Sequence, residues 1–219
     1  MATILSDAEV RVLASLVEKQ VTTPEYYPLT LNALTLACNQ KNNRNPVTSY
    51  DEATISQALE SLREKNLAYV FYGSSSRVPK YKHVMPEVLH LNEQELAALC
   101  VLMLRGPQTL GEIKDRGTRL HEFASLEEVD ATLNSLAAKE PDPFVTRLPR
   151  QAGQKEARFA HLLSGEVSIE APSESESPRR SVRSGDGDRI ARLEQELETV
   201  KTEITALQQQ FEEFKKQFD

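Results

Sequence analysis

The sequence has no tryptophan, few other aromatic residues and only two cysteines. Its apolar runs fall short of the roughly 20 residues that a membrane-spanning helix needs, so we expect no membrane partner. Cys38 and Cys100 lie in separate apolar helical stretches, and a buried thiol is the expectation for both because their spacing indicates no metal or redox pair. Few cysteines and no signal peptide are typical of a cytoplasmic protein.

The chain also lacks a recognisable set of catalytic residues. The four histidines are scattered, with no i, i+4 pair and no cysteine neighbours: His83, His90, His121 and His161. There is no nucleophile elbow, phosphate loop or glycine-rich fingerprint. We therefore predict a protein that is not an enzyme and that uses no metal or cofactor, with an enzyme or small-molecule sensor as the most distant alternative.

The negative charge of the chain is unevenly spread. The formal net charge is -7, which argues against a generally basic coat for nucleic acid. Residues 1–88 are net neutral, residues 89–165 carry -2 and residues 166–219 carry -5. Because most of the excess lies in the last segment, the preceding part of the chain remains a candidate for binding a polyanion.

The most informative stretch runs from Ser49 to His83. It begins with a predicted helix whose apolar residues share one face, namely Ile55, Leu59 and Leu62. Ser49 and Glu52 have the spacing of a capping box at the helix start. Two runs rich in aromatic and β-branched residues follow, separated by a turn at 73–76, which is typical of a β-hairpin. A helix followed by a hairpin is the second half of a winged helix.

The same pattern returns at 125–161. The apolar positions of 55–62 match those of 129–136, and Ser61 and Lys65 match Ser135 and Lys139. The opening helices also correspond, since Leu5 to Glu9 and Leu91 to Glu95 each carry a capping box, Ser6 with Glu9 and Asn92 with Glu95. Three elements that match in the same order predict tandem copies of one module.

We therefore predict a mainly α (α+β) chain of two tandem winged-helix domains, 1–88 and 89–163, followed by a disordered linker at 164–188 and a coiled coil at 189–219. In the first copy we expect helices at 6–19 and 29–39, an extended connection at 20–29 and a polar loop at 39–46. In the second, Gly106-Pro107 ends the first helix, Thr109 with Glu112 and Ser125 with Glu128 cap the next two, and 144–148 and 158–162 form the hairpin.

The last stretch has the heptad pattern of a coiled coil. The predicted dimerisation residues are spaced three and four apart: Ile190, Leu193, Leu197, Val200, Ile204, Leu207, Phe211 and Phe214. Isoleucine at a positions and leucine at d positions favour two strands, and two of the g–e pairs are attractive while none is repulsive. We predict a parallel homodimer, with a trimer left open because the seam ends in phenylalanines.

The charges of the two modules suggest how they bind a partner. Both third helices are acidic, which disfavours their entry into a phosphate-lined groove. The hairpins and the polar loop instead supply the predicted nucleic-acid contacts: Lys41, Arg44, Arg77, Lys80, Lys82, Arg147, Arg150, Lys155 and Arg158. The alternative for the hairpins is that charged edges block sheet aggregation, and for the loop that it is an ordinary solvated turn.

Two functional hypotheses follow. The first is a dimeric, transcription-regulator-like protein that binds double-stranded DNA mainly through basic wings, as fold analogy favours. The second is a protein–protein adaptor that docks a partner on its acidic third helices.

Several strings of residues resemble one family. They are 18–29 (EKQVTTPEYYPL), 37–41 (ACNQK), 45–47 (NPV), 104–109 (LRGPQT), 111–112 (GE) and 161–167 (HLLSGEV). The stretch from about Leu5 to Val167 is similar to the YceH-like family of uncharacterised bacterial proteins. The resemblance implies a fold of two winged-helix domains, and it brings no activity, ligand or site residues.

Overall fold

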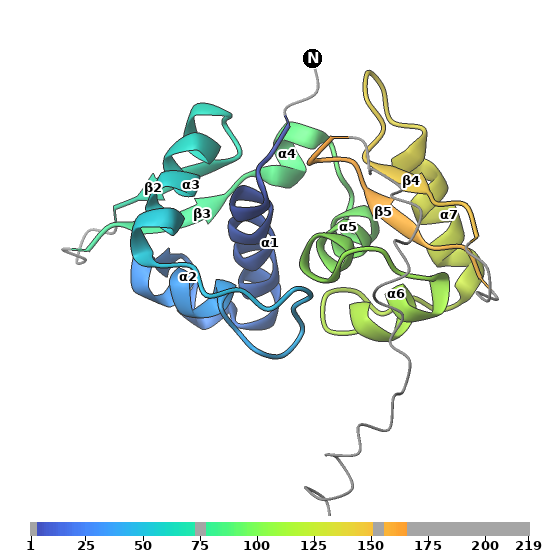
Figure 1. Cartoon of the computed structure of the whole chain (residues 1–219), viewed down its shortest axis with the longest axis horizontal. Coiled ribbons are helices and arrows are strands. Elements are labelled where there is room, and N and C mark those ends of the chain that lie inside the picture. Colours follow the sequence, from blue (N-terminus) through green and yellow to red (C-terminus); the bar gives the residue numbers. More distant parts are fainter. Residues whose placement is uncertain (1–3, 73–77, 151–155, 166–219) are drawn as a thin grey trace, which may run out of the picture. The chain divides into compact units, whose positions relative to one another are not determined.

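The computed structural model describes residues 4–72, 78–150 and 156–165, all of which belong to one compact unit, Met1–Ile169 (Figure 1). The predicted coil at 189–219, with its dimerisation residues, and nearly all of the predicted linker lie outside the described residues. The predicted boundary between residues 88 and 89 falls inside this unit and stays a prediction from the sequence. Within the described residues, no helix is both long and apolar enough to span a membrane.

The fold is a mixture of helices and short strands whose order repeats. The first half contains α1 (Asp7–Thr22), a 3-10 turn η1 (Pro24–Tyr26), β1 (Leu29–Thr30), α2 (Leu31–Cys38), α3 (Glu52–Glu64), β2 (Ala68–Phe71) and β3 (Lys80–His83). A short helix, α4 (Met85–Leu89), leads into the second half, which contains α5 (Glu93–Arg105), α6 (Leu110–Gly117), α7 (Leu126–Ala137), β4 (Val145–Arg147) and β5 (Phe159–His161).

Each half joins its hairpin to the residues just before its second helix. In the first half, β3 pairs antiparallel with both β2 and β1, with Leu29 opposite Tyr81. In the second half, β5 pairs with β4 and forms an isolated bridge between Gln108 and Phe159, with backbone hydrogen bonds of 3.0 and 2.7 Å. Tyr81 and Phe159 therefore hold equivalent places in the two halves.

A buried carboxylate is also repeated. Ser6 and Glu9 form the capping box of α1, and the Glu9 carboxylate accepts a hydrogen bond from Lys65 Nζ. In the same way, Asn92 and Glu95 cap α5, and the Glu95 carboxylate accepts from Lys139 Nζ at 3.1 Å and from Ser135 Oγ at 2.8 Å. Both lysines also donate to a carbonyl two residues before the cap, Ile4 O and His90 O respectively. The matched lysines of the two copies thus have one structural role.

Helices α1 and α5 lie at the centre of the unit. Residues 9–18 of α1 and 97–104 of α5 are buried without a break. Such all-round burial indicates a helix enclosed on every side. The Cys100 thiol donates to Ala14 O at 3.4 Å, so the two helices are in contact, and one continuous hydrophobic core includes residues from both halves. Both cysteines are free and buried, as expected.

The predicted start of α3 is wrong. The helix begins at Glu52 with Asp51 as its N-cap, whose Oδ1 accepts from Thr54 N at 2.8 Å, and Ser49 makes no capping box. The reason is the preceding residue: Tyr50 N donates to Asn39 Oδ1 at 2.8 Å, and Tyr50 O accepts from Asn39 Nδ2 at 2.7 Å. These two bonds tie the Tyr50 backbone to Asn39 before the helix can start.

The connection predicted at 20–29 is only partly extended. α1 continues to Thr22, a 3-10 turn follows from Pro24, and Leu29 already belongs to β1. α4 was not predicted, although Pro86 in its first turn is a helix-start signal. The other helices and both hairpins lie close to their predicted ranges. Ser125 is confirmed as the N-cap of α7. The Glu128 carboxylate accepts from the backbone of the preceding residue, Ala124 N, at 2.6 Å rather than from Ser125 N.

Candidate functional site

The first hairpin presents an outer face of alternating aromatic and basic residues. In the β2–β3 register, Tyr69 lies opposite Lys82 and Phe71 opposite Lys80. Residues that face each other across an antiparallel pair point to the same side of the sheet. Tyr69 and Phe71 are 37% and 42% exposed, and the following Tyr72 is 75% exposed. The other side of the sheet, with Ala68 and His83, faces the core.

The lysines of this face are available to a ligand. Lys82 Nζ lies 5.3 Å from the centre of the Tyr69 ring, a cation–π contact that leaves its donors free. The Lys80 side chain makes no hydrogen bond or ion pair with the described residues. The described part of this hairpin, 68–72 and 78–83, contains no acidic residue. Arg77, the third predicted contact, lies outside the described residues.

The second hairpin uses two of its cations, Arg147 and Arg158, within the fold. Arg158 directly precedes Phe159, as Lys80 precedes Tyr81, so the two cations are equivalent. Arg158 donates to the Glu112 carboxylate at 2.7 Å and to Pro107 O at 2.9 Å. Arg147 lies over the Phe159 ring, with 5.9 Å from its guanidinium carbon to the ring centre. Phe159 and Ala160 are buried, so this hairpin has no exposed aromatic face among its described residues. Arg150 is exposed, and Lys155 lies outside the described residues.

The two predicted contacts in the polar loop have different surroundings. The Arg44 side chain is fully buried. Its guanidinium donates to both oxygens of Glu18, at 2.6 and 3.1 Å, and to Ala37 O at 2.8 Å. Arg44 therefore holds the loop to α1 and α2 and is unavailable at the surface. Lys41 is exposed, and its side chain makes no hydrogen bond or ion pair with the part of the chain that the structure describes.

The exposed surface of α3 is acidic, as the sequence suggested. Asp51, Glu52, Glu60 and Glu64 are all exposed, and Arg63 pairs with Glu60 at 2.8 Å. In α7, Glu127 is exposed and Leu126 is 46% exposed. Neither helix presents a cationic surface.

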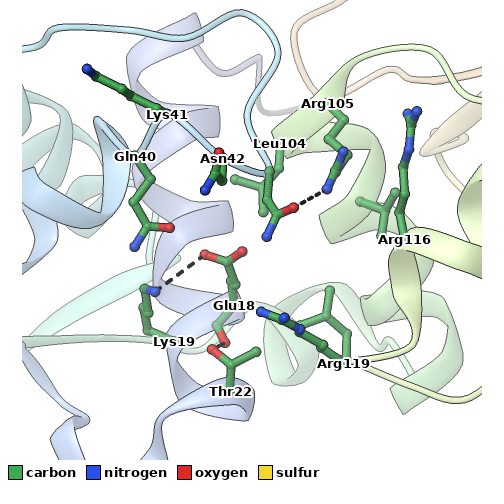
Figure 2. Close-up of a pocket in the computed structure, with 13 residues that line it drawn as sticks. Glu18, Lys19, Thr22, Gln40, Lys41, Asn42, Leu104, Arg105, Arg116 and Arg119 are labelled. Carbon is green, nitrogen blue, oxygen red and sulfur yellow. Dashed lines mark hydrogen bonds and ion pairs between the residues drawn. The ribbon is translucent and has the colours of Figure 1, made fainter. Parts of the chain in front are cut away.

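A cleft with several cations lies between α1 and the polar loop on one side and α5 and α6 on the other (Figure 2). Its volume is about 760 Å³. The cations come from four separate segments: Lys19, Lys41, Arg105, Arg116 and Arg119. Except for Lys41, sequence reasoning missed this set. No spacing rule joins residues that only the packing of α1 on α5 brings together.

Cysteine and metal chemistry find no support among the described residues. No group of three or more histidine, cysteine or acidic side chains is arranged to hold a metal ion in that part of the chain. Burial raises the pKa of the Cys38 thiol to about 11 and also raises that of Cys100. Both thiols therefore stay protonated and unreactive at neutral pH.

Comparison with known proteins identifies relatives along the whole chain. A family described as "Protein of unknown function, DUF480" matches residues 5–154. A UPF0502 protein of Opitutus terrae is 57% identical over 80% of this chain and 76% of its own length. UPF0502 proteins of Pelobacter propionicus and Geobacter sulfurreducens are 50% and 48% identical over the full length of both chains.

These matches confirm the predicted resemblance to an uncharacterised bacterial family. The family match includes the first hairpin, β4 and all seven α-helices that the structure describes, and it ends before β5. The identities extend over full-length relatives, and the chain therefore belongs to the DUF480 family of bacterial proteins.

Proposed function

We propose that this chain is a DNA-binding protein built from two winged-helix modules and that its first hairpin is the main contact. The order of three helices and a hairpin, present twice, supports the winged-helix assignment. The short pairing between the hairpin and the start of the second helix, also present twice, supports it further. The tandem modules would then share one buried seam between α1 and α5.

The observation that carries the proposal is the outer face of β2 and β3. Lys80 and Lys82 are partly exposed beside Tyr69 and Phe71, with no acid nearby in the described hairpin. Lysines placed in this way can neutralise backbone phosphates and release counterions. The aromatic side chains supply flat surfaces against sugars or unpaired bases. A hairpin serving only as a protected edge needs the charges but not the exposed rings.

The acidic surface of α3 supports contact through the hairpin rather than through the helix. In the usual helix-turn-helix mode, a recognition helix lies in the major groove between two rows of phosphates. Asp51, Glu52, Glu60 and Glu64 would face those phosphates with like charge. We infer that α3 stays outside the groove while the hairpin reaches the backbone.

Dimerisation through residues 189–219 belongs to this proposal. The heptad pattern Ile190 to Phe214 favours a parallel pair, and two copies would double the number of phosphate contacts. Deleting 189–219 is expected to leave a folded monomer, which light scattering measures directly. A dimer that survives this deletion would contradict the coil assignment.

The test is fluorescence anisotropy of a labelled mixed-sequence duplex at several salt concentrations between about 50 and 200 mM, a range over which several phosphate contacts cause a large loss of affinity. Replacing both Lys80 and Lys82 with glutamate is expected to weaken binding for every sequence. It should also reduce the slope of log affinity against log salt by about 0.9 for each phosphate that is no longer neutralised.

The matched control is Arg63→Glu on α3, which makes the same change of charge as Lys80→Glu alone. Arg63 is exposed and pairs only with Glu60 among the described residues. If the hairpin is the contact, Lys80→Glu weakens binding more than Arg63→Glu. If Arg63→Glu has the larger effect, the hairpin model is wrong and the helix is the contact.

A second candidate is the adaptor, which one observation favours. α3 offers four exposed acids on one short helix and its N-cap, a surface suited to a basic protein segment. Anisotropy that stays flat even at low salt would retire the DNA proposal. A pull-down comparing the native chain with a Glu60→Lys, Glu64→Lys variant would then test α3 as the docking surface.

A further inference from the structure

The cleft of Figure 2 concentrates positive charge in a chain that is acidic as a whole. On one side the lining includes Arg105 from α5, Arg116 from α6 and Arg119 from just after α6. On the other side it includes Lys19 from α1 and Lys41 from the polar loop. Glu18 is the one acidic residue of the lining. Five cations around one cavity repel one another, which favours an anion between them.

The single carboxylate of the cleft, that of Glu18, is already paired with a buried arginine outside the lining. Arg44 donates to both oxygens of Glu18, at 3.1 and 2.6 Å, and the Arg44 side chain is fully buried. Lys19 Nζ lies 3.9 Å from the same carboxylate. Because the Glu18 charge is matched by Arg44, the five cations of the lining have no equivalent countercharge within the cavity.

The cations are held to different degrees. Arg105 donates to Asn43 Oδ1, and Arg116 donates to Gln108 and pairs with Glu112, so these two are positioned before any ligand arrives. Burial lowers the pKa of Arg105, and the nearby charges of Arg116 and Arg44 lower it further. Arg119 and Lys41 are exposed, and their side chains make no hydrogen bond or ion pair within the described residues. They are therefore free to close on an anion.

The rest of the lining suits the remainder of a nucleotide. Val101, Leu104 and Leu120 provide an apolar wall, and Gln40 and Asn42 bring amide groups that can donate and accept. The volume of about 760 Å³ lies within the range of small-molecule sites in proteins. A flat ring could lie against the apolar wall while its polar edge meets the amides.

We propose that this cleft binds a nucleoside polyphosphate, with Lys41, Arg105, Arg116 and Arg119 contacting its phosphates. One guanidinium group can donate two parallel hydrogen bonds to a phosphate group. Several such groups suit a chain of phosphates better than a single phosphate. The cavity is concave and lies between helices and the polar loop, whereas the phosphates of a duplex lie on a convex surface. The inference does not depend on DNA binding by the hairpin.

The test is isothermal titration calorimetry of the full chain with ATP, inorganic tripolyphosphate and AMP. We expect affinity to fall in that order, because ATP uses both the cations and the apolar wall while AMP offers one phosphate. Replacing Lys41 and Arg119 together with alanine is expected to weaken ATP binding at least about tenfold, since each loses a charge-assisted hydrogen bond. Both residues are exposed, so far-UV circular dichroism should show an unchanged fold.

The matched control is Arg63→Ala, which removes an exposed arginine from α3, away from the cleft lining. It should leave ATP affinity within about twofold of the native value, as expected for a change outside the site. Absence of heat with both ATP and tripolyphosphate at low salt would overturn the proposal, as would equal losses in the cleft variant and the control.

A competition experiment separates a small-molecule site from a nucleic-acid surface. Adding an unlabelled short duplex should leave ATP binding unchanged if the cleft holds a nucleotide. Displacement of ATP by the duplex, together with loss of duplex binding in the Lys41→Ala, Arg119→Ala variant, would assign the cleft to the nucleic acid and contradict the proposal.

Discussion

The two hairpins differ in what surrounds their equivalent cations. Lys80 of the first hairpin stands on an open face beside Phe71, whereas Arg158 of the second is bound by Glu112 and by a backbone carbonyl. The two hairpins are similarly rich in basic residues. The comparison shows that a count of charges does not identify a binding surface until their neighbours are known.

One residue accounts for much of this difference. Thr30 and Thr109 are the N-caps of α2 and α6, and the third residue of each helix is Ala33 in the first half and Glu112 in the second. Glu112 completes a capping box and also accepts from Arg158. Since Ala33 has no carboxylate, nothing at this place can hold Lys80, and its charge remains available.

The largest effect that we expect concerns pH and two equivalent histidines, His83 and His161, which pair with the first residues of β2 and β4. His83 Nδ1 accepts from Met85 N at 3.3 Å, and burial, followed by the charge of Lys82, lowers the pKa of His83 to about 4. Because the unfolded pKa is near 6.5, the unfolded chain binds more protons between these values. The contribution of His83 is therefore complete above about pH 6.5 and is lost as the pH falls toward 4.

Replacing His83 with asparagine, which keeps an acceptor near Met85 N, should remove this loss. Between pH 7 and pH 4.5 the native chain should lose about 2–3 kcal/mol more stability than the variant, measured by urea unfolding. Burial lowers the pKa of His161 also, but Asp7 opposes the shift, so His161→Asn should remove less of the loss. Equal effects of the two variants would mean that the pKa values of the two histidines are lowered to the same extent in the two halves.

A second effect tests what the halves share. Lys65→Met and Lys139→Met each leave a buried carboxylate, Glu9 or Glu95, without its cation. For both acids, burial alone would raise the pKa, but the bonds from lysine, serine and the capped backbone outweigh it and lower the pKa. We expect a loss of about 2 kcal/mol in each variant, below the range for fully buried pairs because the lysines are partly exposed.

Urea unfolding of Lys65→Met and Lys139→Met would check this, with Lys41→Met as the control for an exposed lysine. A large loss in only one of the two variants would show that the repeated contacts differ in strength. The direction with pH is the same for both acids: their stabilisation is present near neutrality and is lost as the pH falls through the lowered folded pKa.

Much of the fold was predictable because its signals are local. The periodicity of Ile55, Leu59 and Leu62 and the spacing of Ser6 with Glu9 lie within one helix and its cap. The start of α3 was mispredicted because it depends on Asn39, which is distant in sequence and holds Tyr50 through two hydrogen bonds. Local spacing alone could not show that interaction.

The candidate site was less predictable for the same reason. Arg44 lies among asparagines in a loop that the sequence describes as polar, yet it is buried against Glu18 from α1. Arg105 lies in α5 and Arg119 lies just after α6. They line one cleft with Lys19 only because α1 packs on α5. The matching of Lys65 with Lys139 was visible in the sequence, whereas the buried carboxylates that explain it were not.

A smaller effect tests how the second hairpin uses its arginine. Arg158→Ala removes the bonds to Glu112 and Pro107 and should destabilise the chain by about 1 kcal/mol, as for a partly exposed ion pair with added hydrogen bonds. The equivalent Lys80→Ala removes no such bond and should change stability by less than about 0.5 kcal/mol. Thermal or urea unfolding of the two variants measures the difference, and equal losses would contradict the contrast between the hairpins.

The smallest effect concerns DNA affinity and exchanges the residue that distinguishes the halves. Ala33→Glu places a carboxylate where Glu112 lies in the second half, so it should draw Lys80 away from a phosphate and weaken duplex binding about threefold, as for one screened surface charge. The reciprocal Glu112→Ala frees Arg158 and should strengthen binding slightly. Anisotropy at low salt measures both, after unfolding curves have shown that each variant is folded. If both variants weaken binding, Glu112 supports the interface in some other way and the proposed origin of the difference between the hairpins is wrong.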